Sequence, residues 1–368
     1  MPYLRKVGIV LVCAVVAAVA LVAVRAHKSD RHAAPPATTA TTATTATSTQ
    51  ATEQRDTGIK PTIRGLVEQF DDRTAELTNT LHSFVVSAYW SDLQPEAGGP
   101  IAHPNAIDDA IAAVRTGSER KPSRLKVRIF AGIYAPEWAK TLGGAPFTIQ
   151  DPASGRGGTV GRFWTSEFGD AYAALQRELA ATYDDVPEIA EVTVSRCTTV
   201  FAEPFLRQIT YSGAPDAYLD AGYTRAADER CQREEIDAHD VWKRTRSGLA
   251  LNPYQFVGPE RRGYVDGDVT TAMMRYCRDT LGPRCVLENN SIRWPPQGQR
   301  YTAMYTAMKD FGPPISFQTA AAARIGDPVE TVRWAIRFGA GAVELGARAN
   351  AYSHAQLVDL DAALTAGN

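Results

Sequence analysis

The sequence lacks several patterns that mark common protein classes. Its 39 Lys and Arg residues nearly balance its 41 Asp and Glu residues, so no basic surface predicts binding to nucleic acid. No Gly-x-Gly-x-x-Gly or phosphate-binding loop follows an apolar strand, which argues against a nucleotide site. No Gly-x-Ser-x-Gly turn and no Cys/His spacing supports a serine hydrolase or a zinc site. The sequence therefore predicts no cofactor, no metal ion and no nucleic-acid partner.

Charge is also missing from two stretches at the amino end. Val7–Val24 is apolar and follows a short basic start. As a helix it would span about 27 Å, close to the hydrocarbon thickness of a bilayer. We expect residues 1–28 to be an uncleaved signal-anchor that crosses the cell membrane once, with the rest of the chain extracellular. The same pattern is typical of a signal peptide, and secretion after cleavage is the alternative.

The second charge-free stretch, Ala33–Thr52, consists almost entirely of Ala and Thr. It has no periodic apolar face, so burial cannot offset the entropy lost on ordering it. We expect residues 29–57 to be a disordered linker between the membrane segment and a domain at residues 58–368.

Four of the five cysteines lie in the predicted domain. An exported domain favours disulfides, and four cysteines permit three pairings. Cys277 and Cys285 flank a short loop between a predicted helix and a predicted strand, which favours Cys277–Cys285 together with Cys197–Cys231. Four free buried thiols are the alternative.

Apolar stretches typical of strands alternate with amphipathic stretches typical of helices over the predicted domain. The predicted strands are Ile63–Val67, Phe84–Tyr89, Leu125–Ala131, Ile189–Ser195, Tyr254–Val257, Arg284–Glu288, Ile315–Gln318 and Ala342–Leu345. The predicted helices are Asp71–Leu81, Ile107–Val114, Thr165–Tyr183, Asp228–Arg246, Val269–Thr280, Tyr301–Asp310, Pro328–Phe338 and Ser353–Leu364. This α/β alternation predicts a monomeric (β/α)₈ TIM barrel, with an open doubly wound sheet as the alternative.

Active sites of such barrels lie at the carboxyl ends of the strands. Tryptophans gather in the segments that follow predicted strands, where an indole ring can support the face of a sugar. The predicted substrate-binding residues there are Trp90, Asp92, Trp138, Trp164, Arg196, Asn289, Asn290, Trp294 and Gln318. They favour a carbohydrate ligand.

Carboxylates at the same strand ends are the predicted catalytic residues. Glycoside cleavage uses one protonated acid and one ionised carboxylate on either side of the bond. Glu203 and Glu344 are the best pair and Glu288 is the third candidate. Glu344 stands inside an apolar run, where an unpartnered charge is costly. An internal salt bridge, for instance to Arg128 or Arg196, is the alternative explanation for it.

Two segments, Ala88–Pro95 and Thr199–Pro204, resemble the (β/α)₈ glycoside hydrolases whose acid/base Glu follows strand four. In that clan the Glu stands within Asn-Glu-Pro, so the resemblance implies an acid/base role for Glu203. Ala202 replaces the Asn of the motif, which removes a contact to the sugar.

The nucleophile of that clan follows strand seven, where this chain has Gln318. An amide cannot form the glycosyl ester. The second carboxylate is therefore Glu344 or Glu288, the strand count is off by one, or the barrel binds glycan without cleaving it. We expect a membrane-tethered, glycoside-hydrolase-like protein that acts on an extracellular polysaccharide or glycan.

Overall fold

A computed structural model of the chain describes residues 58–72, 74, 77, 79–116, 124–206, 209 and 213–366. The predicted membrane segment and the predicted Ala/Thr linker lie outside these residues. Within the described ranges, no helix has the length and apolarity needed to cross a membrane.

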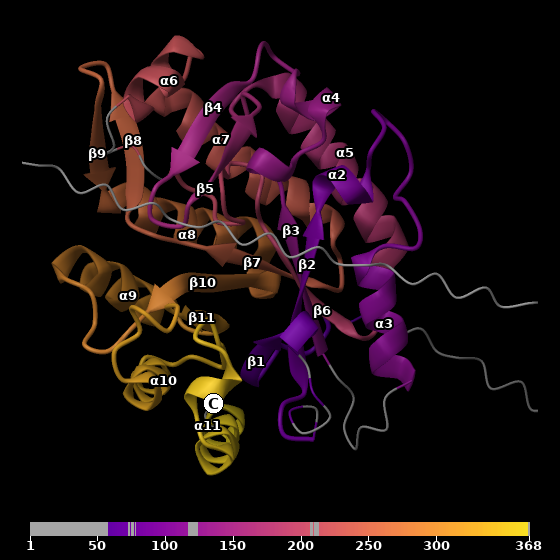
Figure 1. Ribbon diagram of the computed structural model, residues 1–368, viewed down its shortest axis with the longest axis vertical. Coiled ribbons are helices and arrows are strands. Elements are labelled where there is room, and N and C mark those ends of the chain that lie inside the picture. The colour runs from indigo at the N-terminus through magenta and orange to yellow at the C-terminus, as the bar shows by residue number, and fades with distance from the viewer. Residues whose placement is uncertain are drawn as a thin grey trace, which may run out of the picture. The chain divides into compact units, whose positions relative to one another are not determined.

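In the described part of the chain, eight parallel strands close into a barrel (Figure 1). They are β1 Gly65–Gln69, β2 Ser83–Tyr89, β3 Arg124–Phe130, β6 Ile189–Thr193, β7 Arg246–Ala250, β10 Cys285–Ile292, β11 Ile315–Thr319 and β12 Ala342–Glu344. The last strand pairs with the first, Ala342 beside Gly65, which closes the sheet. The predicted barrel is confirmed, and the open sheet is excluded because such a sheet keeps two edges.

Helices cover the outside of the barrel (Figure 1). The longer ones are α3 Ala106–Thr116, α5 Ser166–Tyr183, α7 Arg225–Ala238, α8 Gly267–Leu281, α9 Gln299–Phe311, α10 Pro328–Arg337 and α11 His354–Ala366. Shorter helical segments are α2 Trp90–Leu93, α4 Glu137–Lys140, α6 Ala214–Asp220, and the 3₁₀ turns Phe70–Asp72, Gly132–Tyr134, His239–Val241, Gly282–Arg284 and Ala349–Ala351. The predicted helix Asp71–Leu81 falls partly outside the described residues.

The fifth barrel strand differs from the prediction. The predicted strand Tyr254–Val257 belongs to β8, Tyr254–Gly258, which pairs antiparallel with β9, Arg262–Asp266, outside the barrel. The true fifth strand, β7, begins at Arg246, the last residue of the predicted helix Asp228–Arg246, and continues into residues that were assigned to no element. Its inward residue Gly248 leaves no room for a side chain, since an added Cβ would lie 2.8 Å from the Glu288 carboxylate. A strand with a single large apolar side chain, here Leu249, gives little sequence signal.

The numbering of the other barrel strands is unaffected by this error. The prediction counted β8 as the fifth strand in place of β7, so the total between the fourth and the sixth strand is the same. Gln318 lies in β11, the seventh barrel strand. The hypothesis of a strand count off by one is therefore wrong.

Two antiparallel hairpins are inserted in the segments that follow barrel strands β3 and β7. The β4–β5 hairpin, Phe147–Asp151 with Arg156–Val160, follows α4, and β8–β9 follows β7. Both hairpins and α6 lie in the upper half of Figure 1, away from α10 and α11.

Large apolar side chains pack between the strands and the helices, whereas the inside of the barrel holds few apolar side chains and several charged ones. Its apolar layer is small and consists of Ile63, Val67, Val85, Ala190 and Ala342. Buried charged side chains fill the space beside that layer: Lys126, Arg128, Glu191, Glu288 and Glu344. Barrels of this type normally fill this space with branched apolar residues.

Both predicted disulfides are confirmed. Cys197–Cys231 joins the loop after β6 to α7, and Cys277–Cys285 joins the end of α8 to β10. The first closes a separation of 34 residues and the second a separation of 8.

We predict that the two disulfides stabilise the domain unequally. Chain-entropy arithmetic gives about 4 kcal/mol for the longer loop and about 2.5 kcal/mol for the shorter. Replacing Cys197 and Cys231 by Ala should therefore lower the melting temperature more than replacing Cys277 and Cys285. Thermal unfolding of both double variants tests this, and the reverse order would contradict it.

Candidate active site

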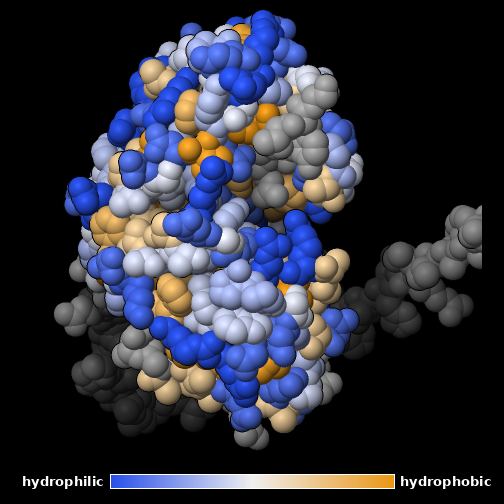
Figure 2. Space-filling view, turned by 90° about the vertical axis from the view of Figure 1, so that its left-hand side faces the viewer, coloured by the Kyte–Doolittle hydropathy of each residue, from blue (hydrophilic) through white to orange (hydrophobic). Residues whose placement is uncertain are grey.

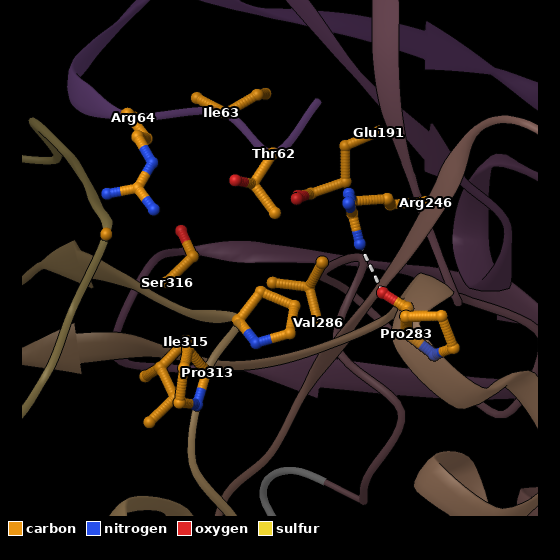
Figure 3. A pocket seen from close by; sticks show the side chains of 12 residues that line it. Thr62, Ile63, Arg64, Glu191, Arg246, Pro283, Val286, Pro313, Ile315 and Ser316 are labelled. Atoms are coloured by element: carbon orange, nitrogen blue, oxygen red, sulfur yellow. Dashed lines mark hydrogen bonds between the residues drawn. The ribbon is translucent and has the colours of Figure 1, made fainter. Parts of the chain in front are cut away.

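Two cavities lie at opposite ends of the barrel. The one at the amino end has a volume of about 300 Å³, and Figure 3 shows its side chains. Arg64, Pro283, Pro313 and Gly341, which line it, all precede barrel strands. Catalytic residues of such barrels come from the other end, so we place the candidate site in the second cavity.

That second cavity, here called the mouth cavity, has a volume of about 420 Å³. Its walls come from the carboxyl ends of β10 and β11 and from segments after β6, β7, β10, β11 and β12. The lining residues are Phe201, Glu203, Phe205, Asn252, Gln255, Asn290, Ser291, Arg293, Gln297, Tyr301, Gln318, Thr319, Ala320, Ala321, Arg324 and Gly346. Figure 2 shows the side of the molecule with the β8–β9 hairpin and α9, where the surface is largely hydrophilic and is hollowed.

Several contacts fix the loop that carries Glu203. The Cys197 N–H donates to the Glu235 carboxylate at 2.9 Å, and the Cys197–Cys231 disulfide ties the same residue to α7. On the other side, the Ile133 N–H donates to the Thr199 carbonyl at 2.9 Å. The loop is therefore held from two neighbouring elements before it reaches Glu203.

Gly132 makes this approach possible. It has a φ of +55°, and an added Cβ would lie 1.9 Å from the Thr199 carbonyl oxygen. Only glycine combines that backbone conformation with so close a contact.

An amide network orients the Glu203 carboxylate. The Asn252 side-chain amide donates to Glu203 at 3.3 Å. Its oxygen accepts hydrogen bonds at 3.2 Å from the Tyr301 hydroxyl and from the Asn289 amide. The Tyr305 hydroxyl lies 3.0 Å from the Asn289 oxygen and extends the network into the core. Asn289 is therefore a buried support, and it does not reach the cavity.

A β-bulge gives the cavity two polar residues. The register of β10 against β11 shifts between Asn289 and Ile292, so one extra residue is inserted there. Asn290 and Ser291 occupy this stretch and line the cavity. Bulges next to active sites commonly redirect side chains in this way.

Glu344 lies beneath the cavity floor. It pairs in register with Gln318, which lines the cavity, yet Glu344 itself is 2% exposed. Both of its oxygens accept hydrogen bonds from the Arg128 guanidinium, and the Gln69 amide donates to one of them at 2.6 Å. Burial alone would raise the pKa of Glu344, but Arg128 outweighs it and holds this pKa below its usual range.

The salt bridge to Arg128 is one of the two alternatives considered for Glu344. The other candidate partner, Arg196, is engaged elsewhere: it donates to the Phe163 and Thr165 carbonyls and to Glu234. Arg196 is almost fully buried, so the expectation that it binds substrate is corrected.

Glu288 lies farther from the mouth. It pairs in register with Ser316, which lines the amino-end cavity. Both of its oxygens are 2.6 Å from the Lys126 ammonium, which also lies 3.1 Å from Glu191. Burial, and then the Glu191 carboxylate, raise the pKa of Glu288 well above its usual range. Three carboxyl groups, those of Glu191, Glu288 and Glu344, thus share the inside of the barrel with the two cations Lys126 and Arg128.

The tryptophans are placed differently from the prediction. Trp90 is 0% exposed and packs edge-on against Trp138, while Trp164 packs among Phe163 and Tyr223. A sugar platform needs an open ring face, so the expectation for Trp90 and Trp164 is corrected.

The remaining predicted residues do not line the mouth cavity. The half-buried Trp138 donates its indole N–H to the Gln94 carbonyl at 3.2 Å. Trp294 is half-buried with Arg337 at 5.9 Å from its ring, and Asp92 is exposed on α2. Of the predicted site residues, the structure brings Glu203, Asn290 and Gln318 together around the mouth cavity.

Sequence reasoning missed Asn252, Tyr301, Arg293 and Arg324. Asn252 follows the true fifth strand directly, so a correct assignment of β7 would have placed it at a strand end. Arg293 directly follows β10, so the strand-end signal applies to it as well. Arg324 lies farther along the loop after β11 and Tyr301 lies near the start of α9, where strand ends give no signal. No cluster of three or more His, Cys, Asp or Glu that could hold a metal ion occurs among the described residues.

No protein-family model and no curated protein matches the sequence. Among solved structures, the chain is similar to the catalytic domain of β-amylase from Paenibacillus polymyxa, with 12% identity and a TM-score of 0.49 over 82% of this chain and 95% of that one. It is also similar to endo-glycoceramidase II from Rhodococcus sp., with 13% identity and a TM-score of 0.48 over 83% and 79%. A mannanase catalytic domain from Streptomyces sp. SirexAA-E has 14% identity and a TM-score of 0.41 over 78% and 74%. These similarities are distant, and the barrel is assigned from its strand pairing.

We predict strong coupling between Arg128 and Glu344. Glu344→Leu alone leaves a buried cation without its partner and should cost about 3–5 kcal/mol of unfolding free energy. Adding Arg128→Met to it should restore much of that loss. Urea unfolding of both single variants and the double variant measures the coupling, and additive losses would contradict it.

The buried contact that holds the Glu203 loop should depend on pH. Burial raises the pKa of Glu235 to about 8, so the fold prefers the protonated carboxyl. The unfolded pKa is about 4.3, and a raised folded pKa means that this stabilising contribution is lost as the pH rises from about 4 through about 8. Glu235→Gln stays neutral and should lose less stability than wild type over that range. Unfolding midpoints of the two proteins test this, with the exposed Glu178→Gln as control; parallel curves for wild type and Glu235→Gln would contradict it.

Proposed function

We propose that this protein is an exported, glycoside-hydrolase-like barrel that acts on an extracellular polysaccharide or glycan, with Glu203 as general acid/base. One observation carries the proposal: Glu203 is the single carboxylate among the described residues that line the mouth cavity. It follows the fourth barrel strand, which is where the resemblance to glycoside hydrolases implies an acid/base residue.

The proposed chemistry divides between two carboxylates. A protonated Glu203 would donate its proton to the oxygen of the leaving sugar, with the Asn252 amide orienting the carboxyl group. Water would attack the anomeric carbon as the glycosidic bond breaks, and Glu344, which Arg128 keeps ionised beneath the floor, would accept the proton of that water. To act as a nucleophile or base, Glu344 would have to give up at least one of its hydrogen bonds to Arg128.

A barrel that binds glycan without cleaving it is the second candidate function. A specific observation favours it: Arg128 engages both oxygens of Glu344, and an amide, Gln318, occupies the strand-seven position. In this case the mouth cavity would bind sugar through Glu203 and its neighbouring amides.

Export and membrane tethering belong to the same proposal. Two disulfides are typical of proteins that fold in an oxidising compartment. The apolar stretch Val7–Val24 would attach the domain to the cell membrane, and the Ala/Thr segment would hold it at a distance.

We predict that Glu203→Gln lowers kcat/KM for a cleaved glycan by about 100-fold or more, because the amide cannot transfer the proton. The measurement is release of reducing ends from a panel of polysaccharides, with Glu178→Gln on the outer face of α5 as the matched control. Full activity of Glu203→Gln would contradict the acid/base assignment. Binding of a glycan by wild type without any cleavage would instead establish the second candidate.

A further inference from the structure

The charge of the mouth cavity points to the class of its ligand. Two guanidinium groups, Arg293 and Arg324, line the cavity against the one carboxylate of Glu203. Arg293 is half-buried and Arg324 is exposed. Among the described residues, neither side chain has a hydrogen-bond or carboxylate partner. The described residues that line the cavity therefore carry a net positive charge, although the whole chain has a formal net charge of −2.

The positive surface continues beyond the mouth cavity. A neighbouring cavity, also of about 420 Å³, shares Gln255 and Tyr301 with it and adds Arg300. No acidic residue lines this neighbour within the described part of the chain. A further guanidinium, that of Arg156 on the β4–β5 hairpin, lies 5.6 Å from the ring of Phe201 at the edge of the mouth cavity. The two cavities together offer room for more than one sugar residue.

Unpartnered guanidinium groups suit an anionic sugar better than a neutral one. A neutral sugar covering Arg293 would remove water from the cation without supplying a counter-charge, which is costly. A carboxylate on the sugar can instead accept two parallel hydrogen bonds from one guanidinium. The amides of Asn290 and Gln318 remain available for the neutral hydroxyl groups.

We propose that the ligand is an acidic oligosaccharide whose sugar carboxylates bind Arg293 and Arg324, with Arg300 contacting an adjoining residue. The inference rests on the proposed glycan ligand and specifies its chemical class. It does not require that the glycan be cleaved.

Calorimetric titration of the full chain with matched trisaccharides tests the inference. The probes are an oligogalacturonate, the neutral cellotriose and a sulfated oligosaccharide without carboxylates. We expect the oligogalacturonate to bind at least about tenfold more tightly than cellotriose, and its affinity to fall as salt is added. Arg293→Gln and Arg324→Gln should each weaken this binding by about tenfold. Arg275→Gln, an exposed substitution on α8, should leave it unchanged.

Several results would overturn the inference. One is equal binding of the neutral and the acidic trisaccharide, and another is tighter binding of the sulfated probe or of a single-stranded oligonucleotide of equal charge. The others are unchanged affinity in both arginine variants and no binding of any probe. Since the two side chains have no described partners, the variants should melt like wild type, which unfolding curves check.

The outcomes also separate this inference from the proposed function. Acidic glycan that binds through Arg293 and Arg324 but is not cleaved contradicts only the hydrolase. Cleavage of a neutral glycan that depends on Glu203 and not on the arginines contradicts only the acidic ligand.

Discussion

The charges buried inside the barrel constrain everything around them. Lys126 and Arg128 both come from β3 and point into the barrel, where neither can be solvated. Each must meet carboxylates from other strands, and they do so through Glu288 of β10 and Glu344 of β12. A shift of β3 by one residue would turn both cations outward and leave the carboxylates unpaired. These pairs therefore fix the register of strands that are far apart in the sequence.

The same pairs separate the two halves of the proposed chemistry. Glu344 is ionised because Arg128 stabilises its charge, and that stabilisation also reduces its readiness to bind a proton or attack a carbon. Glu203 stands above it in a different environment, half-buried and held by the neutral Asn252 amide. Glu344 is thus buried against a cation, whereas Glu203 lies half-buried in the wall of the mouth cavity.

The sequence predicted the barrel because most strands show their apolar outward side chains, as Leu125–Ala131 does. It misplaced the fifth strand because the inward positions of β7 carry Arg246, Gly248 and Ala250, leaving Leu249 as the one large apolar side chain. At the site, Glu203 was recognisable from a short motif next to a strand end. The burial of Trp90 was not recognisable, because it depends on Trp138 of α4 and Phe168 of α5, which come from elsewhere in the chain.

The arginines of the chain show why the remaining site residues could not be read from residue type. Arg196 lies just after a strand, yet its guanidinium donates hydrogen bonds to Glu234 and to two backbone carbonyls. These bonds hold the loop of Glu203 against α5 and α7. Arg293 also follows a strand directly, and Arg324 stands in the loop after β11, yet both reach the mouth cavity. A guanidinium becomes available to a ligand only when the fold supplies it with no internal acceptor. That property belongs to the packing of distant segments, so the charge of the mouth follows from the three-dimensional structure and not from the near-neutral composition.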